Sequence, residues 1–268
     1  MNVELIPIKV KRQQPSFNIH VTILDSIKKN GHKLKNGDIV IISSKFVSMS
    51  ENRIVDLANV KVKKEGKELA ESLSMDPFLA QLVVDEADAV FSGVQGFALA
   101  IKNGVIAPNA GIDKSNIFHG HAILYPEKPY ISAENIRKKV LEKTGKKVGI
   151  VLSDSRLMPT RIGTTGVALA VAGFNHVKDE RGRKDLFGNV LKVTQRALAD
   201  DLCSAAQLLM GEADEGIPIV IARNSGIKIT EKAIDPKSTA VPFSECIYMT
   251  GLSNQNLIEG MRRIKSRP

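Results

Sequence analysis

Val148-Gly-Ile-Val-Leu-Ser153, followed directly by Asp154-Ser155, is the stretch of sequence that decides the fold. Its short apolar run is typical of a β-strand that is buried on both faces of a sheet. We expect the strand to end at Ser153, which places the carboxylate of Asp154 at a strand terminus. Acids at strand termini of α/β enzymes can hold a divalent cation beside a phosphate group. The stretch therefore predicts a sheet-based protein with a metal and a phosphate at one strand end.

A second acidic segment follows a predicted helix over residues 194–210 and reads Met210-Gly-Glu-Ala-Asp-Glu-Gly-Ile217. The C-terminus of a helix carries partial negative charge, which repels phosphate but attracts a cation. We therefore assign this loop to a metal ion first, through Glu212, and to phosphate only through that metal. The alternative interpretation is a helix C-cap followed by a solvated turn.

A third acid, Asp113, lies in the segment Asn109-Ala-Gly-Ile-Asp113-Lys-Ser-Asn116. Hard cations such as Mg²⁺ and Mn²⁺ prefer oxygen ligands, among them carboxylates, hydroxyls, phosphates and water. Asp113, Asp154 and Glu212, with the hydroxyl of Ser155, are the predicted metal ligands. Taken singly, each acid is better explained as a carboxylate that caps a glycine-containing loop, and only the three together favour a metal site.

The order of predicted elements indicates a mixture of parallel and antiparallel pairing. Ile39-Val-Ile-Ile42 is a continuous apolar run that predicts a doubly buried strand. Asn103-Gly104, between the apolar runs 97–102 and 105–107, predicts a hairpin with a type I′ turn. Strands alternate with helices, and no repeat or low-complexity linker is present. We predict an α+β (mixed α/β) fold in a single unit over residues 1–268, which could contain two subdomains without an evident boundary.

Composition excludes several classes of protein. The 268 residues carry a formal net charge of +9, but the basic residues are scattered. Aromatic residues are 4% and tryptophan is missing, so bases would find few stacking partners and no nucleic-acid partner is expected. No apolar run is long enough to span a membrane. The first residues lack the basic and apolar regions of a signal peptide, and Cys203 (in a predicted helix) and Cys246 (in a predicted strand) are interpreted as reduced thiols, so a cytoplasmic location is expected.

Other polar residues give weaker signals. Arg161, in the loop after Asp154, and the basic loop 181–188 could bind phosphate or carboxylate groups, although composition alone favours exposed charged turns. His119 and His121 have no acid or cysteine at ligand spacing, which favours surface histidines. The chain contains neither a P-loop nor a Gly-x-Gly-x-x-Gly motif. Any nucleotide must therefore be bound by another kind of site.

Four segments in order resemble the coenzyme F420-0:L-glutamate ligase family, and the resemblance extends from Val3 to about Arg223. They are Asn109-Ala-Gly-Ile-Asp-Lys-Ser-Asn116, Val148-Gly-Ile-Val-Leu-Ser-Asp-Ser155, Lys178-Asp-Glu-Arg-Gly-Arg-Lys-Asp-Leu-Phe-Gly188 and Leu208-Leu-Met-Gly-Glu-Ala-Asp-Glu-Gly-Ile-Pro218. The resemblance implies an α+β fold, an intertwined homodimer and a GTP-dependent amide ligase. Such an enzyme adds L-glutamate to the terminal carboxylate of a deazaflavin acceptor through an acyl phosphate, and then adds a γ-linked glutamate.

The resemblance also implies roles for individual residues. Asp113, Asp154, Ser155 and Glu212 would bind Mg²⁺ or Mn²⁺, with two ions expected and K⁺ as a further candidate. Asp154 and Arg161 are the predicted catalytic residues. The predicted contacts with GTP as co-substrate come from three segments: Ser43, Ser44, Asn116, Met210, Gly211, Ala213, Asp214, Glu215, Gly216 and Ile217.

Departures from the family pattern keep alternatives open. The family has Ser-Lys-Ala-Glu-Gly-Arg where this chain has Ser48-Met-Ser-Glu-Asn-Arg53, so Met49 replaces a lysine expected near the GTP phosphates, and Lys45 is a candidate substitute. The segment 156–161 also differs, and Ser155 stands where threonine is common. These changes favour two alternatives: a related ligase with another carboxylate acceptor, or a nucleotide- and metal-binding protein without ligase activity. A nucleic-acid-binding module rests on the net charge alone.

Overall fold

The computed structural model describes residues 2–253 of the chain. The chain divides into two compact units, residues 1–234 and residues 235–268. The described part of the second unit contains the short helices η3 (Pro236–Thr239), η4 (Phe243–Glu245) and α7 (Ile247–Ser253). None of the helices between residues 2 and 253 has the length and apolar character needed to cross a membrane.

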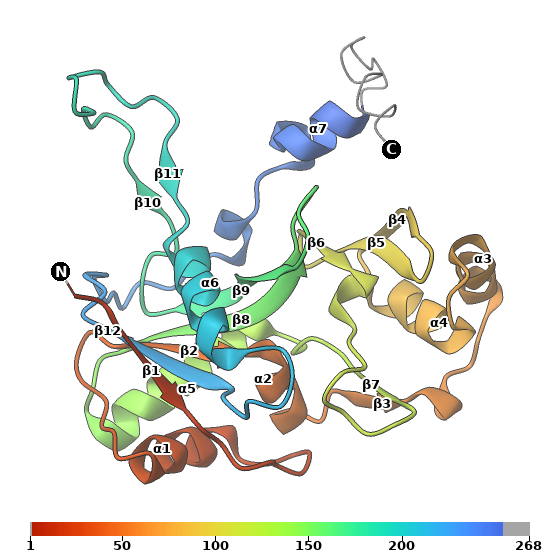
Figure 1. Ribbon diagram of the computed structural model, residues 1–268, viewed down its shortest axis with the longest axis horizontal. Helices are drawn as coiled ribbons and strands as arrows, with labels where there is room; N and C mark the ends of the chain where they lie inside the picture. The colour runs from red at the N-terminus through yellow and green to blue at the C-terminus, as the bar shows by residue number, and fades with distance from the viewer. Residues whose placement is uncertain (1, 254–268) are drawn as a thin grey trace. The chain divides into compact units, whose positions relative to one another are not determined.

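The first unit is built on a five-stranded sheet with the order β1-β12-β2-β8-β9 (Figure 1). Only β2 and β8 are parallel, and the other neighbours are antiparallel. The mixed pairing confirms the predicted α+β class. The bounds of these strands are β1 (Glu4–Ile8), β12 (Ile219–Arg223), β2 (Ile39–Ser43), β8 (Gly149–Leu157) and β9 (Thr164–Ala172).

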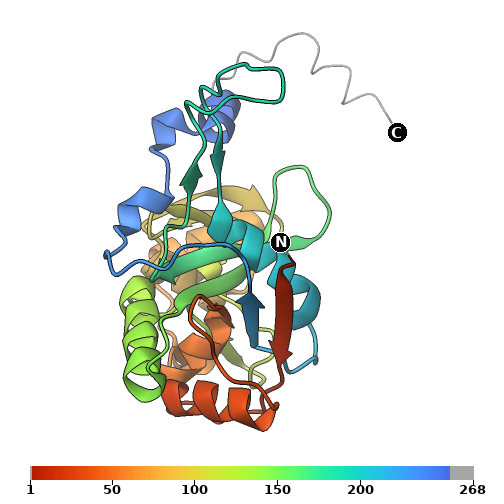
Figure 2. The ribbon, with the colours of Figure 1, turned by 90° about the vertical axis from the view of Figure 1, so that its left-hand side faces the viewer.

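Helices cover both faces of this sheet (Figure 2). Side chains of a strand point alternately to its two faces, so Val40 and Ile42 pack with α1 (Ile19–Lys29) and α5 (Pro129–Thr144). Ile39 and Ile41 pack on the opposite face with α6 (Leu198–Met210). Burial on both faces explains the continuous apolar runs, because each buried isoleucine contributes on the order of 2 kcal/mol.

A second hydrophobic core lies beside the sheet within the first unit. It is formed by α3 (Lys64–Leu73), α4 (Pro77–Glu86), β5 (Phe97–Lys102) and β7 (His121–Ile123), with β4 (Ala89–Val94) packed against it. β6 (Val105–Pro108) pairs with β5, and β3 (Ile54–Asp56) pairs with β7. Asn103 and Gly104 have φ angles of 54° and 77°, which confirms the predicted type I′ turn. The short helical segments η1 (Leu57–Asn59) and η2 (Asn109–Gly111) complete this part, whereas α2 (Ser44–Ser50) packs against the main sheet.

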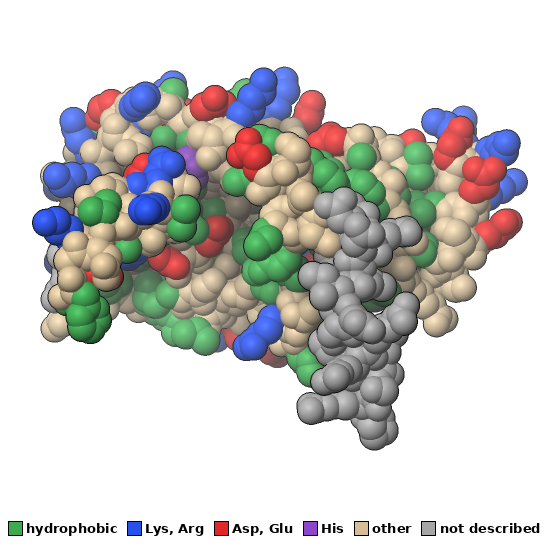
Figure 3. Space-filling model, turned by 90° about the horizontal axis from the view of Figure 1, so that it is seen from above, with side chains coloured by type: hydrophobic (Ala, Val, Ile, Leu, Met, Phe, Trp, Pro, Cys, Tyr) green, Lys and Arg blue, Asp and Glu red, His purple; other side chains and the backbone are tan. Residues whose placement is uncertain are grey.

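A hairpin arm over residues 178–196 extends from the sheet and is paired at its base by β10 (Lys178–Asp179) and β11 (Gln195–Arg196) (Figure 1). Its tip exposes Leu186 and Phe187, at 100% and 91% of their full accessible areas. On the face seen in Figure 3, basic side chains stand apart in several places and alternate with acidic ones. This scatter agrees with the interpretation of the net charge made from the sequence.

Two predicted element boundaries and one predicted strand are wrong. The strand expected to end at Ser153 continues to Leu157, because antiparallel pairing with β9 goes on after the parallel ladder with β2 has ended. The helix predicted from residue 194 begins at Leu198, because Gln195–Arg196 pairs with β10 instead. Cys246 directly follows η4 and lies in no strand, while Cys203 is buried in α6; both are free thiols.

Candidate active site

A cavity of about 710 Å³ opens in the first unit, where β2 and the parallel part of β8 end. Five separate segments line it, and they carry every predicted site residue except Arg161. The segments are residues 9–13, 43–49, 113–118, 153–155 and 207–218, of which a few positions do not face the cavity. Folding therefore brings the metal-ligand and nucleotide candidates together from distant parts of the sequence.

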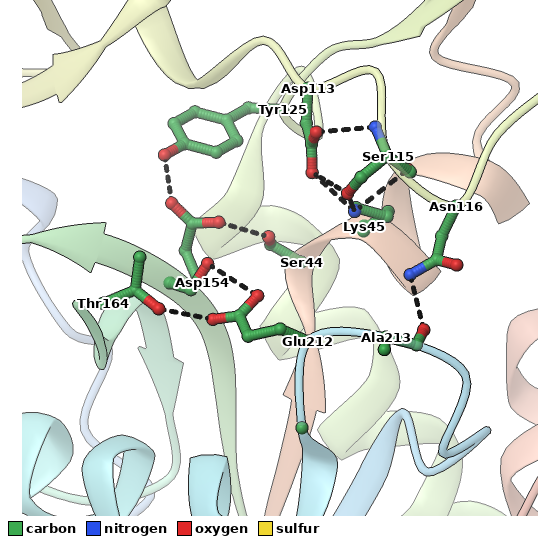
Figure 4. A network of polar contacts seen from close by, with 12 residues as sticks. Ser44, Lys45, Asp113, Ser115, Asn116, Tyr125, Asp154, Thr164, Glu212 and Ala213 are labelled. Carbon is green, nitrogen blue, oxygen red and sulfur yellow. Dashed lines mark hydrogen bonds and ion pairs between the residues drawn. The ribbon is translucent and has the colours of Figure 1, made fainter.

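Asp154 lies on the cavity wall, just past a register shift of β8 between Leu152 and Ser153. Its Oδ2 accepts a short hydrogen bond from the hydroxyl of Tyr125, and its Oδ1 lies 3.3 Å from the hydroxyl of Ser44. The guanidinium Nε of Arg156 lies 3.6 Å from Oδ2. Burial raises the pKa of Asp154, against the opposing effect of the Arg156 charge. Figure 4 shows that this carboxylate links Tyr125 on one side with Ser44 on the other.

Glu212 lies on the loop that follows α6, directly after the C-cap residue Gly211. Its Oε1 accepts hydrogen bonds from Thr164 Oγ1 at 2.7 Å and from Gln207 Nε2 at 2.6 Å. The hydroxyl of Ser155 lies 3.4 Å from its Oε2. Ser155 thus joins the Asp154 strand to the Glu212 loop on one wall of the cavity.

Asp113 is held by a different set of partners. Its Oδ2 forms an ion pair with Lys45 Nζ at 2.5 Å and accepts a hydrogen bond from Ser115 Oγ at 2.9 Å. Burial would raise the pKa of Asp113, but the Lys45 charge and the hydrogen bonds from Lys45 and Ser115 outweigh it and lower the pKa. Lys45 lies in the first turn of α2, one helical turn before Met49, and both residues line the cavity.

The donor chemistry fits a hard cation, because Asp154, Ser155 and Glu212 present only oxygen atoms on a shared wall. Each ionised carboxylate also keeps lone pairs beyond those used by its protein partners. Between residues 2 and 253, however, no three His, Cys, Asp or Glu side chains come close enough to hold one ion between them. Asp113 belongs to a separate hydrogen-bond network from Asp154 and Glu212, so substrate oxygens or water would have to connect them.

The loop 210–217 is held in place by a hydrogen bond from Asn116 and by one within the loop. The Asn116 side chain donates from Nδ2 to the carbonyl of Ala213 at 2.8 Å (Figure 4). Glu215 accepts from the backbone N–H of Ala213 at 2.9 Å, which fixes the turn of the loop. The predicted nucleotide residues Asn116 and 210–217 are therefore direct neighbours, although they are far apart in the sequence.

Arg161 and the basic loop 181–188 lie elsewhere. Arg161 is exposed in the connection between β8 and β9 and does not line the cavity. Residues 181–188 belong to the hairpin arm. The ring Nδ1 of His121 contacts the carbonyl of His119 at 3.1 Å, in agreement with the interpretation of these histidines as surface residues.

Sequence reasoning missed three features of the site. Arg156 lies two residues after Asp154 and faces the same side of β8. The alternation of side chains along a strand would have indicated this, but the strand was expected to end at Ser153. Tyr125 reaches Asp154 only through the tertiary fold, and no local pattern marks it. The basic segment 9–13 could have been found as a charged run that follows a predicted strand.

Comparisons with known proteins match this chain to one family. The family model for F420-0:Gamma-glutamyl ligase matches residues 7–224. A coenzyme F420:L-glutamate ligase of Methanocaldococcus jannaschii is 41% identical over 197 residues, which cover 73% of this chain and 79% of that protein. Proteins of the same name from Methanothermobacter thermautotrophicus and Methanococcus maripaludis are 37% and 38% identical, over 77% and 81% of this chain and 82% and 86% of their own lengths.

Proposed function

The chain belongs to the F420-0:gamma-glutamyl ligase family, and we propose that it is a GTP-dependent amide ligase. It would join L-glutamate to the terminal carboxylate of a deazaflavin acceptor and then add a γ-linked glutamate. The observation that carries the proposal is the single cavity that gathers Asp113, Asp154, Ser155, Glu212 and the loop 210–217. Its relatives are named for ligation of glutamate to coenzyme F420.

The proposed reaction has two steps, because a carboxylate is a poor electrophile until one oxygen becomes part of a leaving group. An acceptor carboxylate oxygen attacks the γ-phosphorus of GTP, the bond to the β–γ bridging oxygen breaks, and GDP leaves. The glutamate amine then attacks the acyl carbon and loses a proton, and the carbon–oxygen bond breaks to release inorganic phosphate. The product is an amide, and one GTP is consumed for each glutamate.

In this proposal, Asp154, Ser155 and Glu212 hold Mg²⁺ or Mn²⁺ on one wall, with Asp113 opposite. The metal, when bound, offsets the repulsion between the acceptor carboxylate and the γ-phosphate. Tyr125 and Arg156 hold Oδ2 of Asp154, which leaves Oδ1 facing Ser44 and the cavity. We propose two such ions, with K⁺ as a further candidate.

The nucleotide is proposed to lie between α2 and the loop 210–217. Ser43, Ser44 and Asn116 supply polar groups there, and Lys45 supplies the positive charge that Met49 lacks. Arg161 remains a proposed catalytic residue, and it acts only if the exposed β8–β9 connection moves toward the cavity.

We also propose that the protein is a homodimer. The exposed Leu186 and Phe187 at the tip of the hairpin arm support this, because fully exposed large apolar side chains on a protruding arm commonly pack against another surface. Light scattering of the purified protein measures the mass in solution.

Mass spectrometry tests the activity directly. The purified protein is incubated with the deazaflavin acceptor, L-glutamate, GTP and Mn²⁺. We expect a product heavier by one or two glutamyl groups, with GDP formed in step. Metal-dependent GTP binding without product would instead support the non-ligase alternative. GDP formation that requires a different carboxylate acceptor would support the related ligase.

A further inference from the structure

The carboxylates of Asp113, Asp154 and Glu212 share a pattern of contacts. In each of them, two protein groups engage one oxygen, and the other oxygen keeps room for a ligand. We propose that this pattern limits each carboxylate to one metal-facing oxygen, so that the cavity takes Mg²⁺ or Mn²⁺ and discriminates against Ca²⁺. The inference rests on the proposed function for the presence of a divalent cation, and it assigns the choice of cation to residues around the ligands.

Glu212 shows the pattern most clearly. Its Oε1 accepts hydrogen bonds from Thr164 Oγ1 at 2.7 Å and from Gln207 Nε2 at 2.6 Å. A carboxylate oxygen has two lone pairs, so these two donors use both of them. Its Oε2 lies 3.4 Å from the hydroxyl of Ser155, a long contact that a cation could replace. A cation bound by both oxygens would have to displace a hydrogen bond to a charged acceptor, which is one of the stronger kinds in proteins.

Asp154 reaches the same result with other partners. Its Oδ2 accepts a short hydrogen bond from Tyr125 and lies 3.6 Å from Nε of Arg156. The guanidinium charge repels a cation that approaches Oδ2. The Arg156 side chain is only 12% exposed and does not line the cavity, so it acts on a cation through Asp154. Oδ1, which lies 3.3 Å from the hydroxyl of Ser44, is the oxygen that remains available.

Asp113 follows the same rule on the opposite wall. Its Oδ2 contacts Lys45 Nζ at 2.5 Å and Ser115 Oγ at 2.9 Å. Its Oδ1 accepts from the backbone N–H of Ser115 at 2.7 Å, which uses one of the two lone pairs of that oxygen. A second cation at this carboxylate would therefore also be held through one oxygen.

Divalent cations differ in the ligands that they require. Ca²⁺ takes about six to eight oxygen ligands and often binds a carboxylate through both oxygens. Mg²⁺ needs a near-octahedral set and usually takes one or two carboxylates, with substrate phosphates and water completing the set, and Mn²⁺ also accepts an octahedron of oxygens. Within residues 2–253, no three acidic, histidine or cysteine side chains gather around one point. Few carboxylates with one available oxygen each satisfy the octahedral cations and leave Ca²⁺ short of ligands.

A double variant with a matched control tests the proposal. Thr164→Val with Gln207→Met removes both donors to Glu212 Oε1 and nearly preserves the size of the two side chains. Thr194→Val with Gln195→Met makes the same two changes at exposed positions of the hairpin arm, outside the cavity. Electron paramagnetic resonance measures bound Mn²⁺, and competition by Mg²⁺ and by Ca²⁺ gives their affinities, with and without GDP. Circular dichroism checks that both variants are folded.

In the wild type, we expect Mg²⁺ to displace Mn²⁺ at lower concentrations than Ca²⁺ does. In the Thr164/Gln207 variant, the ratio of Ca²⁺ affinity to Mg²⁺ affinity should rise on the order of tenfold, because the freed Oε1 can bind Ca²⁺ without loss of charged hydrogen bonds. The control should keep the wild-type ratio. A merely structural role of Thr164 and Gln207 would weaken both cations together and leave the ratio unchanged, which would contradict the proposal.

Tyr125→Phe is a second, independent variant, at Asp154. It frees Oδ2 from its hydrogen bond while the Arg156 charge remains, so the affinity ratio should shift in the same direction by a smaller factor. An unchanged ratio in both variants would overturn the proposal. So would a wild-type protein that binds Ca²⁺ as tightly as Mg²⁺.

These measurements separate the cation preference from the ligase assignment, because they detect binding and need no turnover. A wild type that forms glutamyl product but does not distinguish Mg²⁺ from Ca²⁺ would keep the ligase assignment and remove the preference. A wild type that prefers Mg²⁺, loses that preference in the Thr164/Gln207 variant and forms no product would do the reverse. A wild type that binds no divalent cation, with or without GDP, would refute both the preference and the proposed metal site.

Discussion

The hydroxyl of Tyr125 donates a hydrogen bond to Oδ2 of Asp154. The tyrosine ring packs directly against the backbone of the loop that carries Asp113. A Cβ atom added at Gly111 would lie only 2.0 Å from Tyr125 Cζ. Gly111 thus leaves room for the ring, and the ring fixes one oxygen of Asp154. This arrangement explains why a glycine precedes Asp113 by two residues and connects two of the predicted ligand segments.

Tyr125→Phe keeps the ring and removes the hydroxyl that positions Asp154. We expect Mn²⁺ affinity and kcat to fall roughly tenfold or more, since hydrogen bonds to charged groups contribute about 1.5–3 kcal/mol. Electron paramagnetic resonance measures bound Mn²⁺ without turnover. Tyr130→Phe makes the same change on a partly buried tyrosine outside the cavity and should leave both values unaltered. Equal values for the two variants would contradict the positioning role.

Gly111→Ala should lower the free energy of unfolding by more than the left-handed backbone conformation at this position would by itself. Gly111 and Gly120 have φ angles of 76° and 79°, but an alanine at Gly120 would meet no atom within 4 Å. Both variants carry the backbone strain of about 1–2 kcal/mol, and only Gly111→Ala also collides with Tyr125. Chemical denaturation should show a free energy of unfolding that falls further for Gly111→Ala. A similar loss in both would mean that the ring moves aside easily.

Asp154→Asn tests the metal and catalytic assignments together. The change removes the negative charge that a cation requires, so we expect Mn²⁺ binding and product formation to be lost while circular dichroism stays native. Asp25→Asn, on the exposed face of α1, is the matched control. Wild-type rate and metal affinity in Asp154→Asn would refute the assignment.

The ion pair between Lys45 and Asp113 predicts a dependence of stability on pH. The pKa of Asp113 is lower in the folded protein than in the unfolded chain, so the pair stabilises the fold above the unfolded pKa. That contribution is lost as the pH falls through the folded pKa. Lys45→Met removes it, so the difference in unfolding free energy from wild type should be largest near neutral pH and shrink in acid.

Lys64→Met provides the control for this measurement, because Lys64 pairs with Glu68 on an exposed helix surface. Exposed pairs of this kind contribute little, so its unfolding free energy should follow the wild type at every pH. If Lys45→Met also follows the wild type throughout, the Lys45–Asp113 pair has no net effect on stability.

Met49→Lys addresses the departure from the family pattern. Met49 lines the cavity one helical turn after Lys45, so a lysine there would face the same space. If the methionine marks a lost phosphate contact, calorimetry should show that Met49→Lys binds GTP roughly tenfold more tightly than the wild type. One added hydrogen bond between charged groups has an effect of about this size. Unchanged affinity would mean that position 49 does not reach the phosphates.

Local sequence patterns were sufficient for the elements that depend on local chemistry. The apolar run Ile39–Ile42 is buried as predicted, because a strand covered on both faces has no polar side. Asp76 caps α4 by accepting from two backbone N–H groups, and Asn103-Gly104 forms the expected turn. These outcomes follow from hydrogen bonding and φ preferences within a few residues.

The tertiary structure decided how far β8 extends and which side chains meet around Asp154. Pairing with β9 carries the strand past Ser153, a result that depends on a partner outside the run itself. Lys45 and the segment 9–13 reach the cavity, and Tyr125 reaches Asp154, through the sheet order β1-β12-β2-β8-β9 and the loops around it. The sequence by itself determined the chemical types of the site residues, whereas their partners depended on contacts between segments that no local periodicity specifies.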